Sequence, residues 1–148
     1  IFLTALMYGT TVGISIAILS WMIYGTLNPM GSAGFPLIII LITGQMFYVF
    51  TARVFKNRLD VKSKISLSNI KFGIIGMSCA LAYDIWTNFL DGLIIYGTID
   101  GAIIRIISGI PFSLVHQWSN FIIFSTLIPI ILITVRPKTE GTITYNEK

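Results

Sequence analysis

The stretch GIPFSLVHQWSNFIIFSTLIPIILITV, residues 109–135, decides the fold class of this chain. It contains no Asp, Glu, Lys or Arg, and about 20 mostly apolar residues are enough for a helix to cross a bilayer. Its one ionisable side chain is His116, and Asn120 follows one helical turn later. Because an ionisable group at membrane depth costs roughly 3 kcal/mol on insertion scales, we expect it to face a bundle interior, a partner or a water-filled cavity.

The preceding apolar segment repeats this arrangement. Asp84 lies within residues 67–90, and Asn88 follows one helical turn later. Residues four apart share a helix face, so each ionisable group has a polar companion on its own face. Together they predict a polar chamber inside a membrane protein, and we look for function there.

The composition also indicates a membrane protein. Hydrophobic residues make up 55% of the chain and charged residues 11%, and the mean hydropathy is +0.85, whereas soluble domains carry about 25% charged residues. The net charge is +4, but six of the ten basic residues fall between Arg53 and Lys71, against Asp60 alone. This clustering is a topology signal and argues against nucleic-acid binding. A single cysteine excludes an internal disulfide, and a single histidine excludes a multi-histidine metal centre, so no cofactor is expected.

Turn signals and charges divide the chain into four expected spans, which form one transmembrane bundle over residues 1–135: about 1–24, 35–55, 67–90 and 110–135. The basic loop 56–66 and the tail 136–148 should both be cytoplasmic, at a plasma or inner membrane. An even number of crossings must then separate them. We therefore expect residues 91–109 to be an outer loop, a short helix or a re-entrant segment that does not cross.

Small and polar residues share faces of these spans. Small residues four apart allow helices to approach closely in lipid, and they occur at Gly9, Gly13 and Ala17 and again at Gly76 and Ala80. The stripe through Gly76 and Ala80 continues into Asp84 and Asn88.

On the last span, Ser113, His116, Gln117 and Asn120 lie on one face. Pro111 is expected in the first turn of that helix. The N-terminus of the helix would then point outward, where it could hold a substrate anion.

These patterns predict one ligand pocket in the outer half of the bundle. Its substrate-binding residues are expected to be Asp84, Asn88, His116 and Asn120, helped by Asn28 from the outer loop and by Gln117, Trp86 and Phe112. Two interpretations stay open for both Asp84 and His116. Each contacts a ligand, or each is a structural side chain bonded to a neighbouring helix.

The segments YDIWTN (83–88) and GIPFSLVHQWSN (109–120) resemble the substrate-binding S components of energy-coupling-factor (ECF) vitamin transporters, in an uncharacterised branch of that family. The Gly-rich first span, followed by NPMGSAG (28–34) and GQMFYVF (44–50), is similar to the family's middle section. The resemblance implies a six-helix bundle that binds a vitamin or similar micronutrient and is not an enzyme. Its partners would be a transmembrane coupling protein and two ABC ATPases.

The same resemblance implies that the four expected spans are the last four of six. The chain opens at Ile1 within an apolar run, so we expect about two further spans upstream, one of them the family's docking helix. Two other classes remain as alternatives. One is a structural or assembly subunit, and the other is an intramembrane hydrolase using Ser78 and His116, although Cys79 stands where such an enzyme has glycine.

Overall fold

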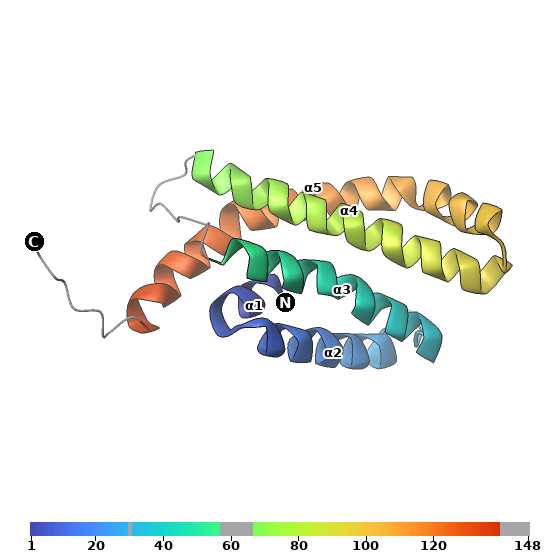
Figure 1. The fold of residues 1–148 in the computed structure, drawn as a ribbon, viewed down its shortest axis with the longest axis horizontal. Helices are drawn as coiled ribbons and strands as arrows, with labels where there is room; N and C mark the ends of the chain where they lie inside the picture. The colour runs from blue at the N-terminus through green and yellow to red at the C-terminus, as the bar shows by residue number, and fades with distance from the viewer. Residues whose placement is uncertain (30, 57–66, 140–148) are drawn as a thin grey trace, which may run out of the picture.

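All regular secondary structure in the computed structural model is helical. The structure describes residues 1–29, 31–56 and 67–139, and within these ranges there is no strand. Five helices follow one another there (Figure 1): α1 (Phe2–Tyr8), α2 (Thr10–Leu27), α3 (Phe35–Phe55), α4 (Leu67–Tyr96) and α5 (Ile99–Thr139). The predicted all-α bundle is therefore confirmed.

Three of these helices are long and apolar enough to span a membrane. They are α2, α3 and the Ile99–Val135 part of α5. Large apolar side chains such as Ile23, Val54 and Ile130 are exposed on them, as expected for helices in contact with lipid. The chain is thus a membrane protein. The described part of α4 is not among the three, because polar residues such as Asp84 and Asn88 lower its hydropathy, and its crossing stays a prediction.

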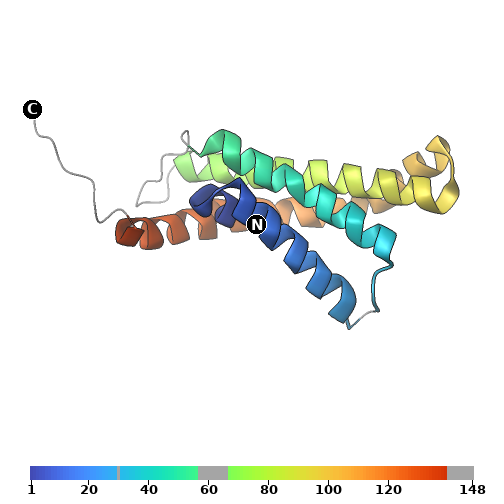
Figure 2. The same cartoon turned by 60° about the horizontal axis from the view of Figure 1, so that its bottom comes forward.

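Helices α4 and α5 form a long antiparallel hairpin (Figures 1 and 2). Helix α4 continues to Tyr96, Gly97 turns the chain at φ +68°, and α5 starts at Ile99. Residues 91–109 are therefore not a loop or a separate short helix, because α4 extends to Tyr96 and α5 begins at Ile99. That this segment does not cross the membrane stays a prediction. The span of α5 rises about 55 Å at 1.5 Å per residue, more than the roughly 30 Å of a hydrocarbon core.

The start of the last helix was also predicted wrongly. Pro111 lies inside α5 and not in its first turn. The N-terminus of α5 lies near the Gly97 turn, so its free N–H groups are not at residues 108–112 as expected. As an interior proline, Pro111 removes the helical bond that residue 111 would donate to the carbonyl of Ile107.

Glycines on α4 let α5 approach closely. A Cβ at Gly73 would lie 2.8 Å from the ring of Phe121, and a Cβ at Gly76 would meet the ring of Phe124. These rings from α5 therefore occupy space that only glycine leaves on α4. Phe124 also packs against Phe2, with ring centroids 5.0 Å apart, and so joins α1 to the same core.

The first expected span is interrupted. Gly9 has φ +101° and ends α1, a backbone conformation that glycine adopts without penalty. A Cβ at Gly13 would lie 2.5 Å from the Cβ of Ala5, so α1 packs against the first turns of α2. Residues 1–24 are thus two helices, of which α2 alone is long enough to span.

Helix α3 occupies residues 35–55 as predicted. It packs on α4, where Gly44 leaves room for the ring of Tyr83. The end of α3, the start of α4 and the end of α5 lie together at the left of Figure 1. Arg53, Lys56 and Lys71 are at this end. That this end of the bundle faces the cytoplasm stays a prediction. The rest of the basic loop and most of the tail lie outside the described residues.

Candidate functional site

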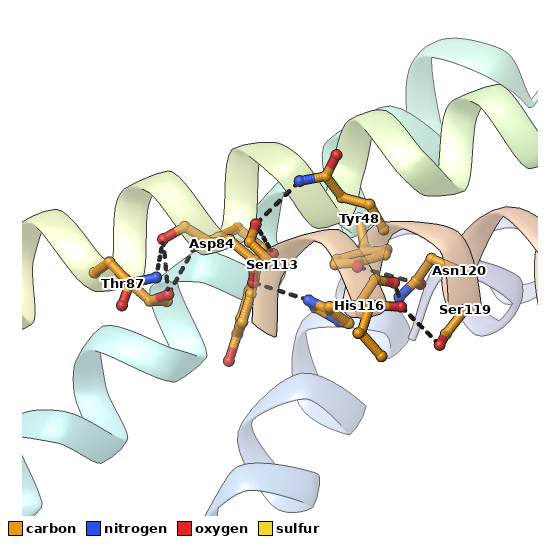
Figure 3. A network of polar contacts seen from close by, with 11 residues as sticks. Tyr48, Asp84, Thr87, Ser113, His116, Ser119 and Asn120 are labelled. Carbon is orange, nitrogen blue, oxygen red and sulfur yellow. Dashed lines mark hydrogen bonds and ion pairs between the residues drawn. The ribbon is translucent and has the colours of Figure 1, made fainter. Parts of the chain in front are cut away.

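Asp84 is the centre of a polar network between α4 and α5 (Figure 3). Its side chain is buried, with 4% of the residue's surface exposed. The hydroxyl of Ser113 donates to Oδ2 at 2.6 Å, and Nδ1 of His116 lies 2.8 Å from Oδ1. Both carboxylate oxygens therefore have partners on α5, which reduces the cost of burying this group.

The network continues along α5 and reaches α3. Gln117 Nε2 donates to the hydroxyl of Ser113 at 3.0 Å, and Asn120 Nδ2 donates to the carbonyl of His116 at 3.0 Å. The hydroxyl of Tyr48 on α3 donates to Asn120 Oδ1 at 3.3 Å. Chains of hydrogen bonds in a low-dielectric interior strengthen one another, and within this network the imidazole of His116 is bonded by Asp84.

A cavity of about 480 Å³ opens on one side of this network. Its volume lies within the range of roughly 300–1,000 Å³ that is usual for small-molecule sites. The lining comes from four helices and mixes aromatic, amide, hydroxyl and charged side chains: Trp21, Leu41, Gln45, Tyr83, Asp84, Thr87, Asn88, Arg105, Ser108, Gly109, Phe112 and His116. The cavity lies beside the polar groups that predicted a chamber, and its level in the membrane stays a prediction.

The structure brings half of the predicted site together. Asp84, Asn88, His116 and Phe112 all line the cavity. Asn88 donates through Nδ2 to the carbonyl of Asp84 at 2.8 Å, and a Cβ at Gly109 would lie 3.1–3.3 Å from its amide atoms. Three of the four residues at the centre of the prediction therefore lie around one cavity, whereas Asn120 does not border it, and a role in substrate binding stays a prediction.

The other predicted residues are not in the lining. Gln117 is buried behind Ser113, and Asn120 lines a separate space of about 280 Å³ on the far side of His116. Trp86 is 39% exposed and donates through Nε1 to Thr43 at 3.0 Å. Asn28 ends α2 and does not border the cavity. At 3.6 residues per turn, Trp86 lies two residues from Asp84 and therefore points to nearly the opposite side of α4.

Several lining residues were missed from the sequence. Gln45, Trp21 and Arg105 lie on three different helices, and no spacing rule connects them to Asp84. The position of Ser113 on the same helix face as His116 indicated that it could belong to the site, although the predicted set of binding residues does not include it. It bonds the carboxylate and does not border the cavity.

The order of the polar groups differs from that of a serine hydrolase. In a catalytic triad the histidine lies between the serine and the acid and takes the serine's proton. Here Asp84 lies between Ser113 and His116. The hydroxyl proton of Ser113 therefore points to the carboxylate and away from the imidazole, and this geometry does not activate Ser113 as a nucleophile.

Comparison with known proteins identifies no relative of this chain. Neither a protein-family model, nor a curated protein, nor a solved structure matches this chain. Inference about function therefore depends on the cavity and the network beside it.

Proposed function

We propose that this chain is the membrane-embedded substrate-binding subunit of an ECF-type importer for a vitamin or another small micronutrient. The observation that carries the proposal is the 480 Å³ cavity lined by four helices of a membrane protein. Its wall combines the aromatic side chains of Trp21, Tyr83 and Phe112 with polar groups that converge from α3, α4 and α5. Such a mixture of apolar surface and few directed polar groups is typical of sites for small organic molecules.

His116 is the residue of this cavity best suited to contact the ligand directly. Its side chain is 27% exposed, and Nδ1 is held by Asp84, which leaves Nε2 as the nitrogen with capacity for a further bond. Asp84 itself has both oxygens bonded to α5. We therefore assign Asp84 the role of positioning His116.

The importer assignment draws on the resemblance of residues 83–88 and 109–120 to ECF S components. In such an assembly a transmembrane coupling protein and two ABC ATPases supply the energy for uptake, and this chain supplies selectivity. The full-length protein, tagged and purified from its own host in lipid nanodiscs, should co-purify with two ABC ATPases and a third membrane protein. Recovery of the tagged chain without any ATPase under several mild extraction conditions would reject the importer assignment.

One observation favours a second candidate, a structural subunit whose polar groups bind its helices together. All hydrogen-bonding atoms of the Asp84 carboxylate are engaged within the protein, by Ser113 and His116. In this case no small molecule would co-purify, and substitutions in the cavity wall away from Asp84 would leave the function of the assembly unchanged. The two candidates therefore differ in whether a ligand is present.

A further inference from the structure

The two ends of the 480 Å³ cavity differ in charge. Arg105 lies at the end near the Gly97 turn, and among the described residues of the lining it is the one lysine or arginine. At the other end, His116 is held by the carboxylate of Asp84. Along α5 the distance from residue 105 to residue 116 is about 16 Å at 1.5 Å per residue. A ligand that contacts both ends must therefore be elongated.

Arg105 keeps unused hydrogen-bonding capacity. Its Nη2 and Nε both contact Oδ2 of Asp91, at 2.8 and 2.9 Å. A guanidinium has five N–H donors, and this pair engages two of them. The side chain of Arg105 is 44% exposed. An anionic oxygen group can therefore bind Arg105 without displacing Asp91, and planar arginine is well matched to carboxylate and phosphate oxygens.

Two hydroxyls in the wall, those of Ser108 and Thr87, are available only as acceptors. The hydroxyl of Ser108 donates to the carbonyl of Ile104 at 2.8 Å, and that of Thr87 donates to the carbonyl of Tyr83 at 2.9 Å. Each hydroxyl has one proton and two lone pairs, so both oxygens retain acceptor capacity only. Asn88 uses one N–H on the carbonyl of Asp84, which leaves its Oδ1 as an acceptor and its second N–H as a donor. The part of a ligand that bonds Ser108 or Thr87 must therefore present an N–H or O–H donor.

We infer that the ligand is an elongated small organic anion, with an anionic oxygen group bound by Arg105 and hydrogen-bond donors on the part that passes Ser108, Asn88 and Thr87. The inference rests on the proposed function and specifies its substrate class. The anion is bound by the side chain of Arg105, the seventh residue of α5. The N-terminus of the helix takes no part in this binding.

Matched probes test this inference without knowledge of the natural ligand. The full-length protein in nanodiscs is titrated with 4-aminobenzoate, 4-aminophenyl phosphate, 4-aminobenzamide and benzoate, and binding is followed by saturation-transfer NMR, which detects millimolar affinities. We expect 4-aminobenzoate or 4-aminophenyl phosphate to bind more tightly than the neutral amide, and 4-aminobenzoate to bind more tightly than benzoate, which has no donor.

Two variants separate anion binding from a structural role of the ion pair. Arg105→Gln should weaken binding of the anionic probes at least tenfold and leave 4-aminobenzamide within about twofold. Asp91→Asn breaks the same ion pair but keeps the cation, so its affinity for the anionic probes should be unchanged or higher. Equal loss in both variants would show that Arg105 only fixes the hairpin, and would overturn the inference.

The remaining outcomes also decide the question. Equal binding of acid and amide, or of aminobenzoate and benzoate, would overturn the inferred ligand class while leaving a small-molecule site in place. Failure of all four probes to bind the wild-type protein would count against the inference as well. If no small molecule co-purifies either, the proposed function falls with it.

Discussion

The carboxylate of Asp84 on α4 and the imidazole of His116 on α5 meet at 2.8 Å between Oδ1 and Nδ1, although 32 residues separate them in the chain. Ser113 completes the contact from the same helix as His116. The two longest helices are thus joined by polar bonds at the wall of the cavity. This relationship determines the behaviour expected of variants at both residues.

Loss of the Asp84 side chain should destabilise the hairpin. Asp84→Leu leaves Ser113 and His116 without their shared acceptor, and each hydrogen-bonding group left unsatisfied costs about 1–3 kcal/mol. Asp84→Asn keeps one acceptor oxygen and should cost about 1–3 kcal/mol. Thermal or denaturant unfolding in detergent measures both.

Asp91→Asn is the matched control for this prediction. Asp91 pairs with Arg105, whose side chain is 44% exposed, and exposed ion pairs contribute about 0–1 kcal/mol. Asp91→Asn should therefore unfold close to the wild type. Equal destabilisation at residues 84 and 91 would contradict the burial-based account of the network.

The contact between α4 and α5 should depend on Gly76. Gly76→Val places side-chain atoms where the ring of Phe124 lies, and overpacking of this kind typically costs about 1–3 kcal/mol. Combination with Phe124→Ala should recover part of the loss, because the space is then free. Gly34→Ala serves as the control, since the nearest atom to its Cβ is 3.9 Å away. Unfolding of the four variants in one detergent checks the prediction, and an additive double variant would contradict it.

The orientation in the membrane can be tested by labelling single cysteines. In a Cys79→Ala background, an impermeant thiol reagent added to intact cells should modify cysteine at position 95 or 100 and not at 62 or 138. The exposed side chains of Ile95 and Asp100 lie beside the Gly97 turn, whereas positions 62 and 138 fall in the basic loop and tail. Strong labelling at position 62 would reverse the predicted topology.

The network also predicts that Asp84 and His116 act as a unit. His116→Ala removes a group that contacts the cavity, and Asp84→Asn alters the partner that orients it. Each should weaken ligand binding about tenfold or more, which corresponds to 1.4 kcal/mol per decade. The effects of substitutions within one network are not additive. The double variant should therefore lose little more affinity than the single variant that binds less tightly. Isothermal titration with the co-purified ligand measures this, and full additivity would show that the two residues act independently.

The part of the site that could be predicted from the sequence consists of residues whose spacing lies within a single helix. Helical spacing placed Asp84 with Asn88, and the apolar length around His116 placed it inside a membrane protein. Antiparallel pairing then put both at one level. The bounds of α3 followed from the turn-rich segment that ends at Gly34 and the basic loop that begins at Lys56.

Other features depended on contacts that spacing does not encode. The break at Gly9 comes from a positive φ, and an apolar run gives no sign of it. Helix α4 extends to Tyr96 and α5 begins at Ile99, with the turn at Gly97 between them. Asp91 and Arg105, charges that resembled a loop, pair between the two helices. Gln45 and Trp21 reach the cavity because α3 packs on α4 and α2 packs on α3.

Native mass spectrometry of the full-length protein purified from its own host tests the central claim, that the cavity holds a small molecule, most directly. Wild-type protein and the Trp86→Phe variant, whose altered side chain lies outside the cavity lining, should both release one small organic molecule. His116→Ala should fold but carry at most about a tenth as much of it. Absence of any bound molecule from the wild type, or equal amounts in all three proteins, would contradict the binding function and favour a purely structural network.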